Sequence, residues 1–165
     1  MAMGLQSRGR GILLCVVLLG LCAGALAQPQ FDEGLAAARR GDNAEAYRLW
    51  LPLAEKGHSN AQNNLGVLYE RGRGVPQNEK TAASWYRRAA EGGNPMAMNN
   101  LGVLYGSGRG VSPDVVQANF WFTLSAAAGN ANGATNRDST SRRLTQAQRE
   151  QVEKLLSEWR AAHSR

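Results

Sequence analysis

Apolar residues recur along the middle of the chain at the spacing of a helix surface. Between residues 61 and 71 they fall at positions i, i+4, i+7 and i+8, which are Ala61, Leu65, Leu68 and Tyr69. Positions with this spacing share one face of an α-helix. The pattern therefore predicts an amphipathic helix over 61–71.

A second helix is predicted over 79–91. Its apolar stripe combines small and large side chains, namely Ala82, Trp85, Tyr86 and Ala89. Small residues opposite large ones allow two helices to interlock. Gly92 or Gly93 is expected to end the helix, because glycine is common just past a helix C-terminus.

The two helices and the loop between them occur twice. Aligning 61–96 with 97–132 gives 17 identical positions out of 36, so the chain contains an internal repeat. A glycine inside a helix costs about 1 kcal/mol against alanine, so the recurrence of Gly66 as Gly102 predicts the close approach of another helix. The repeated positions expected to be structural are Leu65, Gly66, Tyr69, Gly72, Gly74, Trp85, Leu101, Gly102, Tyr105, Gly108, Gly110 and Trp121.

Residues 28–60 are interpreted as a degenerate leading unit. Its first helix is predicted over 31–40, and a short turn at 41–43 replaces the long glycine loop.

Residues 133–165 are interpreted as a polar linker followed by a capping helix. The stretch up to Ser141 is polar and interrupted by Gly133. Thr145 and Gln148 have the spacing of a capping box. The helix that follows has charged residues on one side and an apolar face of Val152, Leu155, Leu156 and Trp159, as expected of the element that closes a repeat stack.

The first 27 residues have the three parts of a secretory signal peptide. Arg8 and Arg10 precede an apolar run over 12–27 that ends in Ala-Leu-Ala, and cleavage is expected after Ala27. An uncleaved membrane anchor is the alternative, although this run is short for a bilayer, which takes about 20 residues. The protein is expected to be exported to the periplasm or secreted, with no stable membrane anchor after cleavage.

Cleavage would remove both cysteines, Cys15 and Cys22. The remaining chain, 28–165, would have no disulfide, no thiol nucleophile and no cysteine-based metal site. Its 17 basic and 13 acidic residues are interspersed. A basic stripe with aromatic residues is the mark of nucleic-acid binding, and none is present, so no nucleic-acid partner is predicted.

The motif "NNLGVLY", followed by a Gly-x-Gly-Val loop and an alanine-rich second helix, resembles the Sel1-like repeat, a relative of the tetratricopeptide repeat. The leading unit and the tail also look like the flanks of such repeats in bacterial exported proteins. The resemblance implies an all-α fold: a right-handed α-solenoid of helix–turn–helix repeats with a C-terminal capping helix. It also implies function through protein–protein contact, since such proteins commonly act as adaptors.

The loop sequence Gly-Arg-Gly-Val, at 72–75 and 108–111, invites comparison with phosphate-binding loops. A Walker loop requires a lysine and a preceding strand, and a dinucleotide fingerprint requires a third glycine; both are missing. The loop is therefore predicted to be a structural turn. Gly72 would take a positive φ, Gly74 would keep the turn tight, and Arg73 would be exposed or bonded to helix-end carbonyls.

No catalytic motif is present, and no catalytic residue, metal site or cofactor is predicted. His58 and His163 lack carboxylate or cysteine partners close in the sequence, so they are interpreted as surface residues rather than zinc ligands. Trp85 and Trp121 are interpreted as core residues rather than as a stacking platform for a sugar or peptide.

A row of repeated residues lies beside the apolar face of each first helix, spaced at i, i+4 and i+8. First helices line the concave side of such solenoids, so this row is predicted to form a peptide groove. Solvated helix surface is the alternative. Asn64 and Asn100, next to the row, are expected to bond a neighbouring turn. The predicted groove residues are Asn63, Val67, Arg71, Asn99, Val103 and Ser107.

These patterns predict an exported, monomeric scaffold or adaptor that binds a protein or extended peptide on its concave face. Two alternatives stay open. One is a peptidoglycan enzyme or enzyme accessory, for which no acid–base pair stands out in the sequence. The other is a module that assembles end to end, against which the charged side of the C-terminal helix argues.

Overall fold

The computed structural model describes residues 28–163. This part of the chain is entirely helices, turns and loops. The helices are one over residues 28–39, α2 (Asn43–Glu55), α3 (Ser59–Arg71), α4 (Glu79–Glu91), α5 (Pro95–Ser107), α6 (Val115–Ala127), α7 (Ala131–Ser141) and α8 (Gln146–His163). The predicted signal peptide, 1–27, lies outside the described residues. Among the described helices, none is long and apolar enough to cross a membrane.

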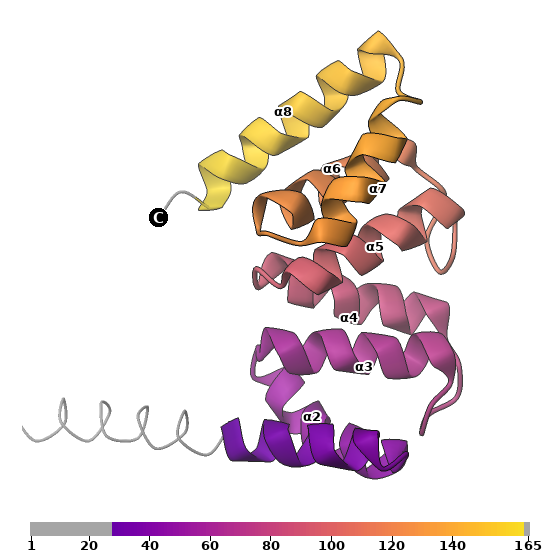
Figure 1. Ribbon diagram of the computed structural model, residues 1–165, viewed down its shortest axis with the longest axis vertical. Coiled ribbons are helices and arrows are strands. Elements are labelled where there is room, and N and C mark those ends of the chain that lie inside the picture. The colour runs from indigo at the N-terminus through magenta and orange to yellow at the C-terminus, as the bar shows by residue number, and fades with distance from the viewer. Residues whose placement is uncertain (1–27, 164–165) are drawn as a thin grey trace, which may run out of the picture.

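The helices stack in pairs into a right-handed α-solenoid (Figure 1), which confirms the predicted fold class. We call the helix over 28–39, α3, α5 and α7 the A helices, and α2, α4, α6 and α8 the B helices. Every A helix ends, and every B helix begins, on one edge of the stack, at the right in Figure 1. The loops within the pairs therefore gather on that edge.

Each repeat begins at a capping residue that the periodicity did not reveal. The side chains of His58, Asn94 and Asn130, 36 residues apart, accept hydrogen bonds from backbone N–H groups three residues further on. They satisfy donors that a helix N-terminus leaves free. Helices α3 and α5 consequently start at Ser59 and Pro95, two residues before the predicted first helices.

The stretch predicted to be a polar linker is a helix, α7, and it makes a fourth A helix. It lacks an apolar stripe, so the hydrophobic pattern could not predict it. Hydrogen bonds hold it instead: the Asn119 amide of α6 donates to Thr140 Oγ1 at 2.7 Å and to Ser141 Oγ at 2.9 Å. Gly133 does not break the helix but allows it to pack closely on α6, since a β-carbon there would come within 2.5 Å of Ser125 Oγ.

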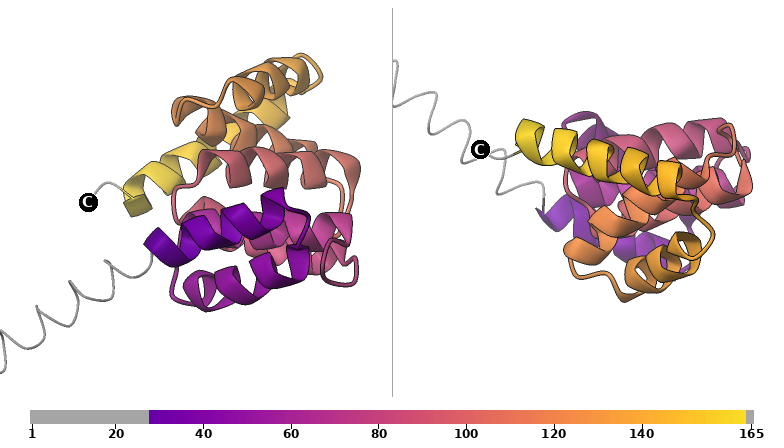
Figure 2. Two further views of the ribbon diagram at one scale, coloured as in Figure 1. Left: turned by 60° about the horizontal axis from the view of Figure 1, so that its bottom comes forward. Right: turned by 90° about the horizontal axis from the view of Figure 1, so that it is seen from above.

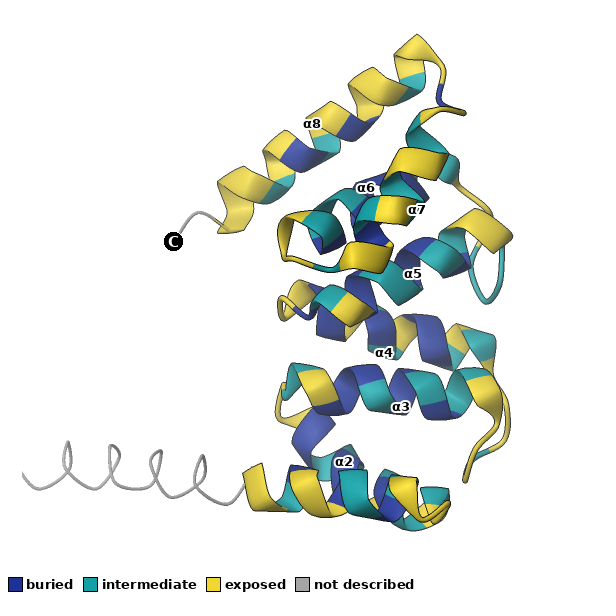
Figure 3. Cartoon of the chain, in the orientation of Figure 1, coloured by how far each residue is buried: buried dark blue, intermediate teal, exposed yellow. Residues whose placement is uncertain are grey.

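Helix α8 closes the stack as predicted. The capping box is present, with the Thr145 N–H donating to Gln148 Oε1 at 2.9 Å and the Gln148 N–H donating to Thr145 Oγ1 at 3.3 Å. Val152 and Leu156 are buried. The helix lies obliquely across the end of the solenoid (Figure 2) and exposes its other side to solvent (Figure 3).

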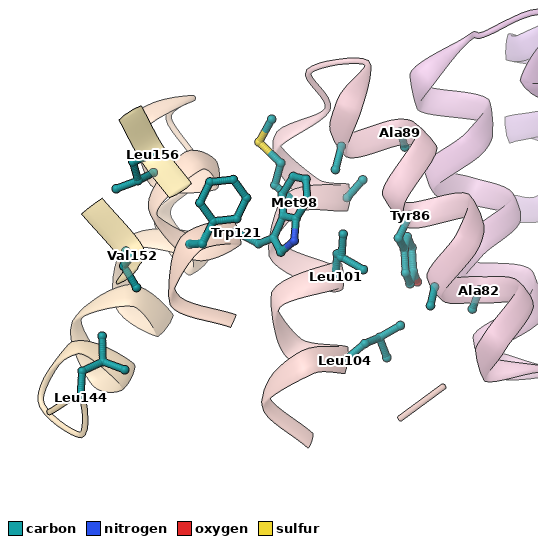
Figure 4. Packing of buried hydrophobic residues seen from close by; sticks show 14 residues of the cluster. Ala82, Tyr86, Ala89, Met98, Leu101, Leu104, Trp121, Leu144, Val152 and Leu156 are labelled. Carbon is teal, nitrogen blue, oxygen red and sulfur yellow. The ribbon is translucent and has the colours of Figure 1, made fainter. Parts of the chain in front are cut away.

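Buried side chains form a core that runs the length of the stack, in two clusters. One joins the leading unit to α3 and includes Trp50, Leu53 and Leu65. The larger cluster reaches from α4 to α8. In it, Trp121 of α6 lies between residues of α5 and residues of α8 (Figure 4). Packing between successive layers, with no disulfide in the described residues, therefore holds the described chain together.

Candidate functional site

The Gly-Arg-Gly-Val loops are turns that end the A helices. Gly72 and Gly108 are the C-caps of α3 and α5, with φ of 62° and 69°. Their N–H groups donate to the carbonyls of Leu68 and Leu104. This left-handed conformation is accessible to glycine without the steric penalty of a β-carbon, so the predicted structural turn is confirmed.

The second glycine of each loop is required for a contact that the sequence did not reveal. Gly74 packs on Asn43, the first residue of α2, where a β-carbon would come within 2.5 Å of the backbone. In the next repeat, Gly110 packs in the same way on Glu79, the first residue of α4. Each loop thus reaches back to the B helix of the preceding pair and joins two repeats.

The arginines in the two loops have different surroundings. Arg109 pairs with Glu70 at 3.0 Å and with Glu79 at 3.5 Å. Glu70 also accepts a 2.6 Å hydrogen bond from the hydroxyl of Tyr86. Burial, together with this hydrogen bond to the carboxylate, raises the pKa of Tyr86 well above its usual range. Arg73 is exposed and has no ion pair among the described residues.

Gly66 and Gly102, inside the A helices α3 and α5, are sites of close helix contact, as predicted. A β-carbon on Gly66 would come within 2.5 Å of the Tyr86 ring, and one on Gly102 within 2.6 Å of the Phe122 ring. Gly34 of the leading unit meets the Trp50 indole in the same way. The contact between Gly34 and Trp50 was not predicted. The leading unit has a shorter loop, so its glycine falls outside the 36-residue register.

The other repeated positions differ in how deeply their side chains are buried. Leu65 and Leu101 are fully buried, and Trp121 is buried against Phe120 and Trp159. Trp85 is half-buried, and the Arg88 guanidinium lies 4.5 Å from its ring centroid.

Tyr69 and Tyr105 are half-buried and bond to different partners. The Tyr69 hydroxyl shares a 3.2 Å hydrogen bond with that of Tyr47. This bond raises the pKa of Tyr69 to about 12. The Tyr105 hydroxyl accepts a hydrogen bond from Arg87.

The predicted groove row contains one residue that does not fit the expectation of an open surface. Asn63 is only 4% exposed, because a neighbouring A helix covers it. Its Oδ1 accepts a hydrogen bond from Asn100 Nδ2 at 3.2 Å. One repeat later, Asn99 Oδ1 accepts from Asn136 Nδ2 at 2.9 Å.

Asparagine amides therefore connect α3 to α5 and α5 to α7, and we call this set of side chains the asparagine ladder. Asn100 bonds the adjacent A helix rather than a neighbouring turn. The paired asparagines in each repeat, with a further asparagine at position 136, are the sequence signal from which the ladder could have been found.

The remaining residues of the row lie nearer the solvent. Val67 and Val103 are half-buried, whereas Arg71 and Ser107 are exposed. The Ser107 hydroxyl donates to the Val103 carbonyl at 2.8 Å. The row thus offers modest apolar surface between polar ends.

The histidines have structural contacts. His58 caps α3 through Nδ1 and stacks on Phe31, with ring centroids 4.8 Å apart. His163 stacks on Trp159 at 3.8 Å. Within residues 28–163 there is no group of three or more His, Cys, Asp or Glu side chains that could hold a metal ion.

Comparison with known proteins agrees with this architecture. The sequence model of the family described as Sel1 repeat matches residues 31–58, 59–94 and 95–130. A protective antigen present in uropathogenic Escherichia coli, which displays the same repeat fold, has a similar structure. Its TM-score is 0.77 and its identity 34%, over 82% of this chain and 30% of the antigen. A Sel1 repeat protein from Oxalobacter formigenes gives a TM-score of 0.63 and 35% identity, over 74% of this chain and 97% of that one.

More distant likenesses agree as well. Cysteine rich protein B of Helicobacter pylori shares the fold, with a TM-score of 0.55 and 19% identity over 66% of this chain and 92% of that one. The chitin synthase regulator SKT5 of Saccharomyces cerevisiae is 39% identical over 77 residues, which are 46% of this chain and 10% of the regulator. The chain thus matches about a tenth of that curated relative. With three matched repeats and the repeat architecture in place, the chain belongs to the Sel1 repeat family, whose members act as scaffolds for protein–protein interaction.

Proposed function

We propose that this chain is an exported adaptor that holds a protein or an extended peptide against the face formed by α3, α5 and α7. This is the concave face of such a solenoid, and we call it the A-helix face. Binding there requires no covalent step. The proposal of export is supported by the signal-peptide pattern over 1–27.

The asparagine ladder is the observation that carries the proposal. It crosses three helices, and each of its amides has a second hydrogen-bonding atom. Asn99 Nδ2 and Asn100 Oδ1 have no partner among the described residues, and both side chains are half-exposed. A free donor and a free acceptor on neighbouring residues can bond the N–H and C=O groups of an extended peptide.

Apolar and charged contacts flank these amides. Val67 and Val103, one per repeat, would bury apolar atoms of the ligand, at about 25 cal/mol per Å². Arg71 and Ser107 stand at the exposed end of each row. With three A helices contributing ladder residues the surface is short, so modest affinity is expected.

The similarity to a protein named as a regulator of an enzyme supports a role through a protein partner. Chitin synthase itself is not inferred to be the partner, because the match covers a tenth of the regulator.

Site-specific photocrosslinking in the producing cells tests the proposal. A photoreactive residue would replace Arg71 or Ser107, which are exposed on the A-helix face, and in parallel the half-buried Val67 or Val103. Matched controls carry it at Ser84 on α4 and Glu153 on α8, which are exposed elsewhere.

A discrete crosslinked band from A-helix positions, missing from both controls, is the expected result, and mass spectrometry of that band identifies the partner. Bands of equal intensity from the control positions, or no band from any of the four A-helix positions, would refute the proposed face.

A further inference from the structure

Arginine pairs lie at the ends of three of the four A helices. The helix over 28–39 is followed by Arg40, α3 ends at Arg71, and α7 is followed by Arg142. Since all A helices end on the edge at the right in Figure 1, these side chains share one side of the solenoid. We call them the arginine edge: Arg39, Arg40, Arg71, Arg73, Arg142 and Arg143.

Acidic residues on the same edge are already engaged. Glu45 pairs with Arg48 at 2.6 Å. Glu70 and Glu79 pair with Arg109, and Asp138 pairs with Arg137 at 2.8 Å. Asp42 and Asp114 cap the N-termini of α2 and α6, and Glu150 near the start of α8 accepts a 3.0 Å hydrogen bond from Gln146 Nε2. None of these carboxylates forms an ion pair with an arginine of the edge.

The six arginines have no ion pair among the described residues. The Arg142 side chain donates to the Asp138 backbone carbonyl, at 3.2 Å. Residues 28–163 contain sixteen basic and thirteen acidic side chains, and the arginine edge holds six of the sixteen basic ones. The opposite edge, where B helices end, has Glu55 and Glu91 together with Lys56, Arg88 and Arg160.

A cleft on this edge adds a seventh cation. Lys80, exposed at the start of α4, lines a hollow of about 480 Å³ together with Gly108, Gly110, Val111 and Ser112. The loop that reaches back over α4 forms its other wall. Walls made mostly of small residues beside the Lys80 ammonium group leave room for a carboxylate.

We propose that the arginine edge docks an acidic segment of a polypeptide. The planar guanidinium matches a carboxylate with two parallel hydrogen bonds, which a lysine ammonium cannot do. The edge presents such groups once per repeat along the first two units and again at α7, an arrangement suited to an extended acidic chain.

Other polyanions fit the edge less well. Single-stranded nucleic acids bind through aromatic stacking as well as charge, and no Phe, Tyr or Trp side chain within 28–163 is exposed. Membrane-surface segments add apolar side chains to their basic ones. Met96, the exposed large hydrophobic residue of the described chain, lies in the first turn of α5, at the opposite edge.

The test compares two charge-reversed variants with the unaltered protein, each purified from producing cells and checked for helix content by circular dichroism. The edge variant is Arg40→Glu, Arg73→Glu and Arg143→Glu, whose side chains make no hydrogen bond within the described residues. The matched variant is Lys56→Glu, Lys154→Glu and Arg160→Glu, exposed residues away from the edge. Both carry the same change in net charge, and both keep Arg71 of the A-helix face.

Fluorescence anisotropy of a labelled oligoglutamate peptide is measured at low salt, beside a labelled single-stranded oligonucleotide and phosphatidylglycerol vesicles. The unaltered protein is expected to bind the peptide in preference to the other two. The edge variant should bind about tenfold more weakly, which corresponds to about 1.4 kcal/mol, while the matched variant stays within about twofold because it alters only long-range charge.

Three results would overturn the proposal: no peptide binding by the unaltered protein, equal weakening in the two variants, or tighter binding to the oligonucleotide or the vesicles than to the peptide. Photocrosslinking from Val67 and Val103 examines the A-helix face one helical turn before the helix ends, so failure of the arginine edge leaves the proposed adaptor face separately testable.

Discussion

The ring of Tyr86 lies against the backbone of Gly66, so close that a β-carbon on the glycine would come within 2.5 Å of the ring. Gly66→Ala must displace this fully buried tyrosine. Overpacking of this kind costs about 1–3 kcal/mol, which exceeds the gain of up to about 1 kcal/mol in helix propensity. Urea denaturation should therefore show a lower free energy of unfolding.

Gly106 provides the matched control, because it lies within α5 and a β-carbon there would meet only Ala118, at 3.8 Å. Gly106→Ala should be neutral or stabilise the protein by up to about 1 kcal/mol. If Gly66→Ala and Gly106→Ala lowered the free energy of unfolding equally, contact with the Tyr86 ring would not explain why residue 66 is a glycine.

Because Gly110 contacts the preceding repeat, replacing it by alanine should cause a large loss of stability. It combines a φ of 68° with a backbone contact to Glu79 that leaves no room for a side chain. Gly93 has a φ of 81°, and a β-carbon there would meet no atom within 4 Å. Both alanine variants carry the left-handed penalty of about 1–2 kcal/mol, and Gly110→Ala should lose about 2 kcal/mol more through the clash. Thermal and urea denaturation of the two variants measure the difference, and similar losses would argue against the contact.

The asparagine ladder predicts energetic coupling between α3 and α5. Asn100→Ala leaves the buried Asn63 without its donor, at a cost of about 1–3 kcal/mol. Replacing both residues by alanine should cost less than the sum of the single changes, by about 0.5–1.5 kcal/mol. Asn63→Ala combined with Ser84→Ala, an exposed residue on α4, should be additive. A double-mutant cycle in urea gives both values, and additivity in the Asn63–Asn100 pair would remove the ladder as a source of stability.

Tyr86 predicts a distinctive response to alkaline pH. Burial raises its pKa in the folded state above the ordinary value of 10.0, so the folded protein keeps a proton that the unfolded chain releases. Stability from this group is complete below pH 10 and falls as the pH rises, by about 1.4 kcal/mol per pH unit.

Tyr86→Phe loses the hydrogen bond to Glu70, about 1 kcal/mol at neutral pH, but has no such alkaline loss. Its stability curve should cross that of the unaltered protein near pH 11, about one unit above the ordinary tyrosine pKa. Parallel curves between pH 8 and pH 11.5 would contradict the shifted pKa. Urea denaturation at several pH values in that interval provides the comparison.

Much of the fold follows from local signals that two repeats share. Helix α4 spans the predicted 79–91, since an asparagine cap precedes it and glycine follows it. Helix α3 begins earlier than expected because its cap is His58, and a histidine is not among the usual capping residues. The repeat register reveals it, since Asn94 and Asn130 occupy the equivalent positions.

What the sequence could not predict depends on partners from other elements. Helix α7 has no apolar face of its own, and its order comes from Asn119 and Ser125 of α6. Asn63 belongs to an exposed row when α3 is considered alone, and only the adjacent A helix buries it. Periodicity describes one helix at a time, whereas these two features arise from contacts between helices.

The loops that reach back over the preceding helix also bear on how this protein can be engineered. Surface loops are ordinarily the best places for a tag or an inserted domain, but residues 72–78 and 108–114 hold neighbouring repeats together through Gly74 and Gly110. An insertion in either loop would disrupt the contact between neighbouring repeats. In the three-residue turn at 40–42, Gly41 has open space around it and contacts no neighbouring repeat. A fluorescent reporter inserted directly before Gly41, which leaves the Asp42 cap of α2 in place, should be tolerated better than one in either long loop.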